Sequence, residues 1–337
     1  MSSVGVSEKA AELHARAVVV DLHNDFLLKA RWFGRDFAQR GRAPIVYTPF
    51  FTDLDLPRCR DGGVDALGFA LWAGRRRPQF ADVNGLMDRL DGIVAKSDGQ
   101  IVLATTAAHI EAAQSRGQLA AFAGIEGGWA IEDDLEKLRA LHARGVRYMS
   151  LTWNSSPAWA RGSGETRRAP EDGLSPFGRD VVREMNRIGM LVDVAHASDR
   201  TFWDVMECST VAPFDSHAGA FAKKAHHRNL KDDQIRAIAK RGGVIGIIFC
   251  TTFLGSLRAG LEVVAEHIEH FLAVGGPECV ALGSDFDGFV PLPRGLKDVA
   301  DLPRLTELLL ARGHSDAVVE GILGRNFLRY FAATLAA

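Results

Sequence analysis

Side chains of the types that bind metal ions follow five of the short apolar runs in this chain. The first run, Ala17–Val20, leads into the sequence Asp21–Leu22–His23–Asn24–Asp25. His23 and Asp25 are two positions apart, so in an extended segment their side chains point the same way and can hold one cation. Alone, such a pair is also typical of an ordinary hydrogen bond between an imidazole and a carboxylate. The metal interpretation therefore depends on the other four runs.

The four later runs each end near a further candidate ligand or carboxylate. They place Glu126 in Gly124–Ile125–Glu126–Gly127–Gly128, His196 shortly after Asp193, His217 in Asp215–Ser216–His217 and Asp285 in Gly283–Ser284–Asp285–Phe286–Asp287–Gly288. The glycines beside Glu126 are expected to allow close approach of the backbone to a ligand. A single glutamate here is often a helix cap, and a single aspartate often orients a turn. Five such residues at strand ends make these structural roles a poor explanation.

This ligand set predicts two metal ions and a hydrolytic reaction. Three histidines and three carboxylates exceed what one tetrahedral zinc needs, so we expect two Zn²⁺ ions bridged by Glu126. A paired site lowers the pKa of bound water and yields a bridging hydroxide as nucleophile, without Ser or Cys. Asp285 is then the candidate proton shuttle, which takes the proton of the water and returns it to the leaving group.

A candidate anion-binding residue follows His217. Arg228 lies in His226–His227–Arg228–Asn229–Leu230, and its planar guanidinium suits a bidentate contact with a substrate carboxylate. A surface salt bridge is the alternative for Arg228. We do not expect His226 or His227 to be ligands. His267 and His270 share one predicted helix face, but without carboxylates at ligand spacing a metal there is not expected.

The order of apolar runs predicts a parallel barrel. The eight expected strands are 17–20, 66–71, 119–125, 148–152, 191–195, 211–214, 244–249 and 280–283. Helical periodicity lies between several of them, as in 133–143, 177–188, 231–240 and 261–274. This alternation favours an α/β fold, a (β/α)8 TIM-type barrel in one domain spanning residues 1–337, with catalytic groups at its C-terminal face. An open doubly wound sheet is the alternative, but no Gly-rich nucleotide loop supports it. Segments 31–61 and 161–173 are expected to be long loops over the barrel mouth.

Composition excludes several function classes. The 40 basic and 42 acidic residues give a net charge of −2, and 47% of residues are hydrophobic. There is thus no overall positive field of the kind that recruits nucleic acid, and Arg75–Arg77 is interpreted as a solvated loop. The four cysteines have no metal-finger spacing and need no disulfides. Without an apolar leader or a membrane-spanning run, we expect a cytoplasmic protein without a membrane anchor.

Taken together, these motifs resemble those of the membrane or renal dipeptidase family of metallopeptidases. They occur in the order of that family across nearly the whole chain, from Asp21–Asp25 to Gly324–Arg325–Asn326–Phe327. The resemblance implies a binuclear zinc site in which His23 and Asp25 hold one metal, His196 and His217 hold the other, and Glu126 bridges them. It also implies that Arg228 binds the terminal carboxylate of the substrate and that Asp285 is the acid–base residue. Such proteins cleave dipeptides, often with a D-residue at the C-terminal position, and usually form homodimers.

One position departs from the family pattern. Better-known animal members have a histidine where this chain has Trp153, and that histidine is thought to contact the carbonyl oxygen during hydrolysis. Asn154, the Trp153 indole N–H or a metal would then share this task. The alternatives for Trp153 are a wall of the substrate pocket or a place in the core.

Two other functions remain open from the sequence. A related barrel hydrolase acting on N-acyl amino acids or on other amides or esters would use the same metal site. A metal-binding barrel without catalysis is the second alternative, and the presence of all five ligands and Asp285 argues against it.

Overall fold

A single parallel sheet forms the centre of the protein. The computed structural model describes residues 5–41, 52–72, 74, 78–169 and 171–335. Its strands are β1 (Val20–Asn24), β2 (Ala66–Leu71), β3 (Ile101–Leu103), β4 (Leu119–Glu126), β5 (Val146–Ser150), β6 (Leu191–Asp193), β7 (Asp215–Ala218), β8 (Ile245–Ile247) and β9 (Val280–Leu282). They are ordered β6-β5-β4-β2-β1-β9-β8-β7, and β3 pairs with β4 outside this order.

The two ends of this order meet, so the sheet forms a nearly closed barrel. Asp193 at the end of β6 bridges in parallel to Phe214, the residue before β7. Two backbone hydrogen bonds reinforce the junction, from Val194 N–H to the Phe214 carbonyl (2.9 Å) and from Phe214 N–H to the Val192 carbonyl (3.1 Å). The predicted (β/α)8 barrel is therefore confirmed, with β3 as an additional short strand at its edge.

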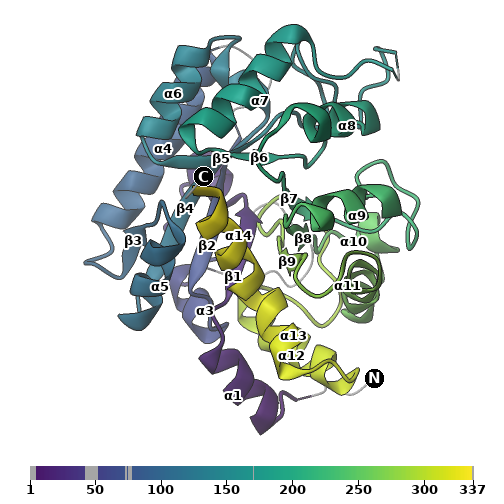
Figure 1. Ribbon diagram of the computed structural model, residues 1–337. Helices are drawn as coiled ribbons and strands as arrows, with labels where there is room; N and C mark the ends of the chain where they lie inside the picture. The colour runs from purple at the N-terminus through teal and green to yellow at the C-terminus, as the bar shows by residue number, and fades with distance from the viewer. Residues whose placement is uncertain (1–4, 42–51, 73, 75–77, 170, 336–337) are drawn as a thin grey trace.

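Helices surround the barrel, as Figure 1 shows. Those before β6 are α1 (Glu8–Arg16), α2 (Phe26–Phe33), α3 (Leu56–Asp61), α4 (Gln79–Ala95), α5 (Ala107–Ser115), α6 (Leu135–Ala143) and α7 (Pro176–Ile188). Those after β6 are α8 (Asp199–Cys208), α9 (Asp232–Lys240), α10 (Thr251–Leu254), α11 (Glu262–Gly275), α12 (Pro303–Ala311), α13 (Asp316–Glu320) and α14 (Asn326–Leu335). Short 3₁₀ turns lie at Gly128–Ile131 and Val299–Asp301, and a π-helical turn at Gly321–Arg325 precedes α14. The four helices named from the sequence correspond to α6, α7, α9 and α11.

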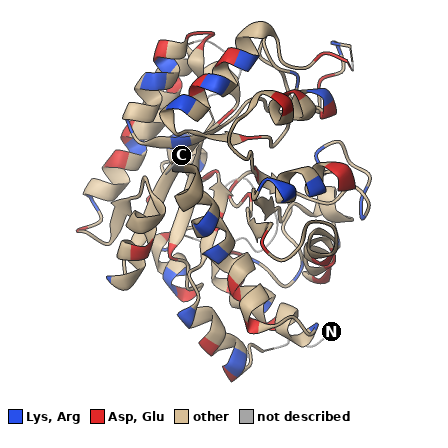
Figure 2. Ribbon diagram, in the orientation of Figure 1, with Lys and Arg blue, Asp and Glu red and all other residues tan. Residues whose placement is uncertain are grey.

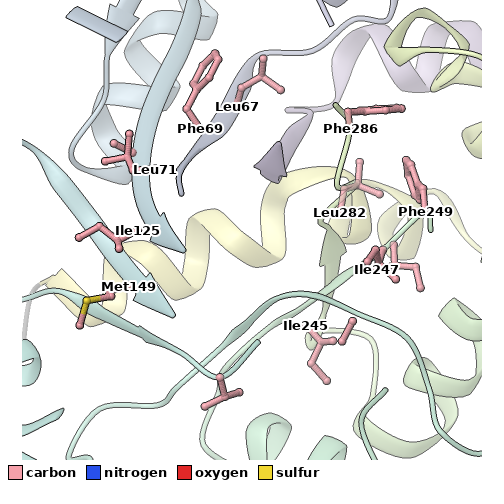
Figure 3. Packing of buried hydrophobic residues seen from close by; sticks show 14 of the residues in the cluster. Leu67, Phe69, Leu71, Ile125, Met149, Ile245, Ile247, Phe249, Leu282 and Phe286 are labelled. Carbon is pink, nitrogen blue, oxygen red and sulfur yellow. The ribbon is translucent and has the colours of Figure 1, made fainter. Parts of the chain in front are cut away.

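Alternating strand residues build two apolar layers. Leu67, Phe69 and Leu71 of β2 point outward from the barrel and pack in one hydrophobic cluster with residues of the surrounding helices (Figure 3). Phe122 and its inward-facing neighbours fill the barrel, where Phe122 stacks on Phe327 of α14 with ring centroids 5.4 Å apart. The α14 residue Tyr330 donates a hydrogen bond to the Ala212 carbonyl just before β7 (2.8 Å). Helix α14 thus closes the N-terminal end of the barrel and leaves the opposite end for a site.

Two expected strands were placed too early in the chain. β1 is Val20–Asn24 instead of 17–20, and β7 is Asp215–Ala218 instead of 211–214. Both real strands carry polar residues that face the barrel mouth, so apolar runs mark only the approach to them. In the segment 211–214, Pro213 also lacks the N–H that a central strand must donate.

The two expected loops have different outcomes. Helices α2 and α3 occupy 31–33 and 56–61, so the loop expectation was wrong there, whereas 34–41 and 52–55 contain neither helix nor strand. Residues 42–51 lie outside the described residues. The described part of 161–173 contains neither helix nor strand, and Ser163 N–H donates to the His196 carbonyl (2.7 Å). This second loop therefore borders the barrel mouth.

The surface mixes charges of both signs. Figure 2 shows acidic and basic residues interspersed along the outer helices. The Arg75–Arg77 cluster lies outside the described residues. Cys59, Cys208, Cys250 and Cys279 are all free thiols. Within the described ranges, no helix combines the length and the apolar character needed to cross a lipid bilayer.

Candidate metal centre

Six side chains singled out from the sequence converge at the C-terminal end of the barrel strands. His23 lies on β1, Glu126 is the last residue of β4 and His217 lies on β7. Asp25, His196 and Asp285 follow within three residues of the ends of β1, β6 and β9. All six are at least nine-tenths buried. The structure thus brings together residues that are up to 262 positions apart in the chain, from His23 to Asp285.

Backbone pairing between β1 and the segment after β9 positions the first part of the cluster. Asp285 N–H donates to the His23 carbonyl (3.1 Å), and Asp25 N–H donates to the Phe286 carbonyl (2.8 Å). Ser284 adds a hydrogen bond from its N–H to Asp21 Oδ1 (2.8 Å). These contacts place the carboxyl groups of Asp25 and Asp285 within hydrogen-bonding distance of each other. One proton shared by two carboxyl groups is the usual outcome of such proximity.

Glu126 lies between two sets of imidazoles. Its Oε1 is 3.0 Å from His196 Nε2 and 3.7 Å from His217 Nε2. Its Oε2 faces the other way and is 3.7 Å from His23 Nε2, which is itself 3.9 Å from Asp25 Oδ2. The two carboxylate oxygens therefore have different nearest imidazoles, which suits a bridging ligand, and the rings of His23 and His217 are stacked with centroids 4.0 Å apart.

The outer nitrogens of these histidines have partners that leave Nε2 facing the cluster. His196 Nδ1 donates to Asn154 Oδ1 (3.1 Å), because an amide oxygen can only accept. Tyr148 donates its hydroxyl proton to the Leu22 carbonyl (3.0 Å), so its oxygen accepts from His23 Nδ1 (3.4 Å). His217 Nδ1 lies 2.8 Å from the Ser216 hydroxyl. Such partners orient metal-binding imidazoles and fix which nitrogen carries the lone pair.

Burial keeps the imidazoles neutral and opposes ionisation of the carboxyl groups. Burial, assisted by the charge of Arg228, lowers the pKa of His23 to about 3 and the pKa values of His196 and His217 well below their usual range. Burial and the neighbouring Asp25 raise the pKa of Glu126 and of Asp285. A cation would reverse the shifts of the carboxyl groups, since it favours their charged forms.

The donor set fits divalent metal ions. His23 Nε2 and Asp25 Oδ1 are buried and have no hydrogen-bond partner among the described residues. His196 Nε2 and His217 Nε2 are only 3.1 Å apart. His23, Glu126 and His217 offer ligand atoms within 4.8 Å of one another, and so do His23, Asp25 and Asp285. Neutral imidazole nitrogens with carboxylate oxygens are the usual ligands of zinc.

Two of the converging residues have left-handed backbone conformations. His196 has φ of 63° and Asp285 has φ of 62°. Such angles are uncommon outside glycine and store strain where the surrounding structure enforces them. The two turns re-aim the chain immediately after β6 and β9, which directs both side chains into the barrel mouth.

A cavity of 290 Å³ opens onto the cluster. Both Trp153 and Asn154 line it, together with Asp25, Leu28, Trp32, Trp72, Glu126, His196, His217, Phe253, Asp285, Gly288, Phe289 and Val290. Trp153 therefore lies at this cavity and not in the core, with its ring 6.2 Å from that of His196. Asn154 contacts His196 through its side-chain oxygen, which the sequence did not indicate.

Arg228 lies behind the cluster and not on the described cavity wall. Its guanidinium is buried and donates from Nη2 to the His217 carbonyl (2.8 Å). It is 6.0 Å from the ring centroid of Phe253, which does line the cavity. Its Nε has no hydrogen-bond partner among the described residues. The group therefore retains donor capacity next to the site.

Several residues of the site were missed by sequence reasoning. Trp72 directly follows the apolar run 66–71, so the strand-end rule that found Glu126 also points to it. Tyr148 and Ser216 lie inside a strand or beside a candidate ligand and carry no separate signal. The close-approach role expected for the glycines was wrong at Gly124, where a Cβ would lie 1.8 Å from the Tyr148 ring. The room at Gly124 accommodates that ring and not a ligand.

A comparison with known protein families decides the relationship. The sequence profile of the membrane dipeptidase family, peptidase family M19, matches residues 7–337. The chain belongs to this family. It is therefore an enzyme of the metallo-dipeptidase class, and the resemblance expected from the motifs is confirmed.

Relatives in sequence and structure agree with this placement. An uncharacterized dipeptidase from Schizosaccharomyces pombe is 31% identical over 351 residues, which cover 97% of this chain and 83% of the relative. The crystal structure of dipeptidase AC, an M19 metallopeptidase, matches with a TM-score of 0.85 and 27% identity over 95% of this chain and 99% of its own. A metallopeptidase from Rhodobacter sphaeroides, solved with a phosphinate mimic of L-Ala-D-Ala, matches with a TM-score of 0.84 and 27% identity over 94% and 99%.

Proposed function

We propose that this protein is a zinc-dependent dipeptidase with two Zn²⁺ ions. His23 and Asp25 would hold one ion, His196 and His217 the other, and Glu126 would bridge them. The observation that carries this proposal is the orientation of Glu126, whose Oε2 is nearest His23 and whose Oε1 is nearest His196 and His217. Membership of a metallopeptidase family and the fit of the donor set support it.

The proposed chemistry divides between the metal ions and two protein groups. Zinc held by these residues would supply a water nucleophile at neutral pH and would polarise the scissile carbonyl. Asp285 borders the cavity beside Asp25, where its carboxylate would accept a proton and then return it to the leaving amine. Arg228 would attract the terminal carboxylate of the dipeptide from behind Phe253. It would do so through the guanidinium N–H groups that do not donate to the His217 carbonyl.

A D-residue at the C-terminal position is part of this proposal. The Rhodobacter sphaeroides relative was solved with a mimic of L-Ala-D-Ala, and it matches nearly all of this chain. We therefore propose that dipeptides of the L-Xaa-D-Xaa type are among the substrates. Cytoplasmic residence and homodimer formation stay predictions, the second of which light scattering of the purified protein tests.

Release of free amino acids from dipeptides tests the proposal. Zinc-loaded protein is expected to cleave members of a panel of L-L and L-D dipeptides, and a chelator is expected to abolish the release. Activity that survives complete metal removal would contradict the proposed chemistry. If no dipeptide is cleaved but N-acyl amino acids or uncharged esters are hydrolysed, the site belongs instead to a related hydrolase.

The Arg228→Ala variant separates these two outcomes further. If Arg228 attracts the substrate carboxylate, the variant raises KM for dipeptides and leaves the hydrolysis of uncharged esters far less affected. Because Arg228 also holds the His217 carbonyl, zinc content must be measured in parallel. An equal loss on both substrate types would assign Arg228 to the support of His217 instead.

A further inference from the structure

Four aromatic side chains form a continuous wall on one side of the cavity. This aromatic wall consists of Trp32 from α2, Trp72 after β2, Trp153 after β5 and Phe289 after β9. Ring centroids are 5.6 Å apart for Phe289 and Trp32, 6.3 Å for Trp32 and Trp72, and 5.2 Å for Trp72 and Trp153. Four segments distant in sequence thus meet in one apolar surface.

The wall runs past the metal-binding cluster without including Arg228. At one end, Phe289 lies four residues after Asp285, and at the other, Trp153 contacts the ring of His196. Arg228 contacts a different cavity residue, Phe253. We therefore consider a dipeptide whose terminal carboxylate lies toward Arg228 and whose peptide bond lies at the cluster. Its N-terminal residue then lies against the aromatic wall.

The other lining residues favour an apolar group over a charged one at the wall. Leu28 and Val290 extend the surface with aliphatic side chains. The charged lining residues are the acids Asp25, Glu126 and Asp285, and no Lys or Arg lies among the described residues of the lining. An acidic substrate side chain would meet no basic residue among the described lining residues, and the buried Lys29 beside Phe289 already lies 3.7 Å from Asp287. The Lys29 ammonium already lies 4.7 Å from the centroid of the Phe289 ring, so this ring offers less open face to a second cation.

We propose that this enzyme selects dipeptides whose N-terminal residue has a large apolar side chain, such as Leu or Phe. The selectivity comes from removal of that side chain from water against Trp32, Trp72 and Trp153. This inference rests on the proposed dipeptidase function and deepens it. A single methylene in an apolar pocket changes specificity by about 10-fold or more, so the effect should be large.

A panel of dipeptides with a fixed C-terminal alanine tests the selectivity. The zinc-loaded enzyme is expected to have kcat/KM at least about tenfold higher for Leu-Ala and Phe-Ala than for Ala-Ala, and higher still than for Glu-Ala. Equal or higher values for Ala-Ala, Glu-Ala or Lys-Ala would overturn this inference while the dipeptidase function stands. Failure to cleave any dipeptide would overturn both.

Variants of the wall locate the source of the preference. Trp32 is half exposed, so Trp32→Ala should fold, and the ratio of kcat/KM for Phe-Ala over Ala-Ala should fall at least about threefold. Trp153→Leu should lower the same ratio. Trp203→Ala is the matched control, because Trp203 is a partly exposed tryptophan on α8 outside the cavity lining. An unchanged ratio in both wall variants, with zinc content and folding intact, would overturn the assignment of selectivity to the wall.

Discussion

Asp285 combines a raised pKa with a position beside a second carboxyl group and a cavity. Burial is the largest influence on the pKa of Asp285 and raises it. The neighbouring Asp25 raises this pKa further, and Arg228 lowers it. We expect Asp285→Asn to lower kcat by about 10²–10⁴-fold, because an amide cannot accept and return the proton. Zinc content should stay close to that of the parent enzyme. A variant with full turnover would exclude the proton-transfer role.

Asn154 is expected to act through His196. Its side-chain oxygen is the acceptor for His196 Nδ1, so Asn154→Ala leaves that N–H without its partner and the ring without its orientation. Zinc affinity measured by competition with a chelator should fall by about 10–100-fold, as is typical when a hydrogen-bond partner of a metal ligand is lost. Asn154→Asp keeps an acceptor oxygen and is expected to retain tight binding. Unchanged affinity in the alanine variant would place Asn154 outside the support of the metal site.

At the scale of elements, β4 and β5 are matched through Gly124 and Tyr148. A Cβ at position 124 would overlap the buried Tyr148 ring, whose hydroxyl contacts the Leu22 carbonyl and His23. Gly124→Ala should lower the free energy of unfolding by about 1–3 kcal/mol, since the packed core must shift. It should also weaken zinc binding through His23. Chemical denaturation and zinc titration measure the two effects.

A matched glycine on a helix serves as the control for this prediction. A Cβ added at Gly85 in α4 would have no heavy atom within 4 Å, so Gly85→Ala should be neutral or stabilising by about 0.5–1 kcal/mol. If both variants behave alike, the effect at Gly124 does not come from contact with Tyr148.

His267 of α11 links a helix to the loop that carries Arg228. Its Nδ1 accepts from Ala220 N–H (2.8 Å) and its Nε2 donates to the Leu254 carbonyl (3.0 Å). Ala220 in turn bridges to Leu230, two residues after Arg228. Protonation of His267 would remove the acceptor for Ala220, so this histidine supports the segment only in its neutral form.

This contact predicts a stability that depends on pH. Burial lowers the pKa of His267 from 6.5 to about 4 in the folded protein, so the unfolded chain binds the extra proton between these two values. The stabilising contribution is complete above pH 6.5, decreases as the pH falls through that window, and amounts to about 3 kcal/mol at most. The difference in free energy of unfolding between the parent and His267→Gln should therefore shrink from pH 7 to pH 4. A difference independent of pH would contradict the assigned shift.

Much of the element order was predictable from apolar runs, while strand boundaries near the site were not. The runs at 66–71 and 119–125 correspond closely to β2 and β4 because both faces of those strands are apolar. β7 was misplaced because its four residues, Asp215–Ala218, are mostly polar. β3 was missed, although it is as long as β6, β8 and β9, which the apolar runs did indicate. Strand boundaries are therefore hardest to predict from the sequence where the strand residues face the cavity.

The fold of the whole molecule brings together residues that are distant in the sequence and that no local sequence pattern connects. The candidate ligands were found because each ends an apolar run, but the aromatic wall required four distant segments to be placed together. Helix α14, which fills the N-terminal end of the barrel with Phe327, carries no sequence sign of that role. The prediction of one domain over residues 1–337 stays a prediction, for which limited proteolysis is the direct measurement.

Metal binding should also stabilise the entire barrel. The candidate ligands come from β1, β4, β7 and the loop after β6, so bound ions join distant parts of the sheet. Any ligand that binds only the folded state raises its stability, by about 2.7 kcal/mol at a concentration 100 times Kd. Chelation should therefore lower Tm, and zinc should restore it. The shift should be smaller in Glu126→Gln, and an equal shift in that variant would contradict the bridging role.

The most direct measurement is dipeptidase activity followed while zinc is returned to the metal-free enzyme in known equivalents. Two ions bridged by Glu126 predict that cleavage of a dipeptide such as L-Leu-D-Ala is absent without metal and reaches its full rate at two equivalents per chain. Glu126→Gln should reach neither that stoichiometry nor that rate. Full activity at zero equivalents, or two bound zinc ions without cleavage of any dipeptide, would contradict the account.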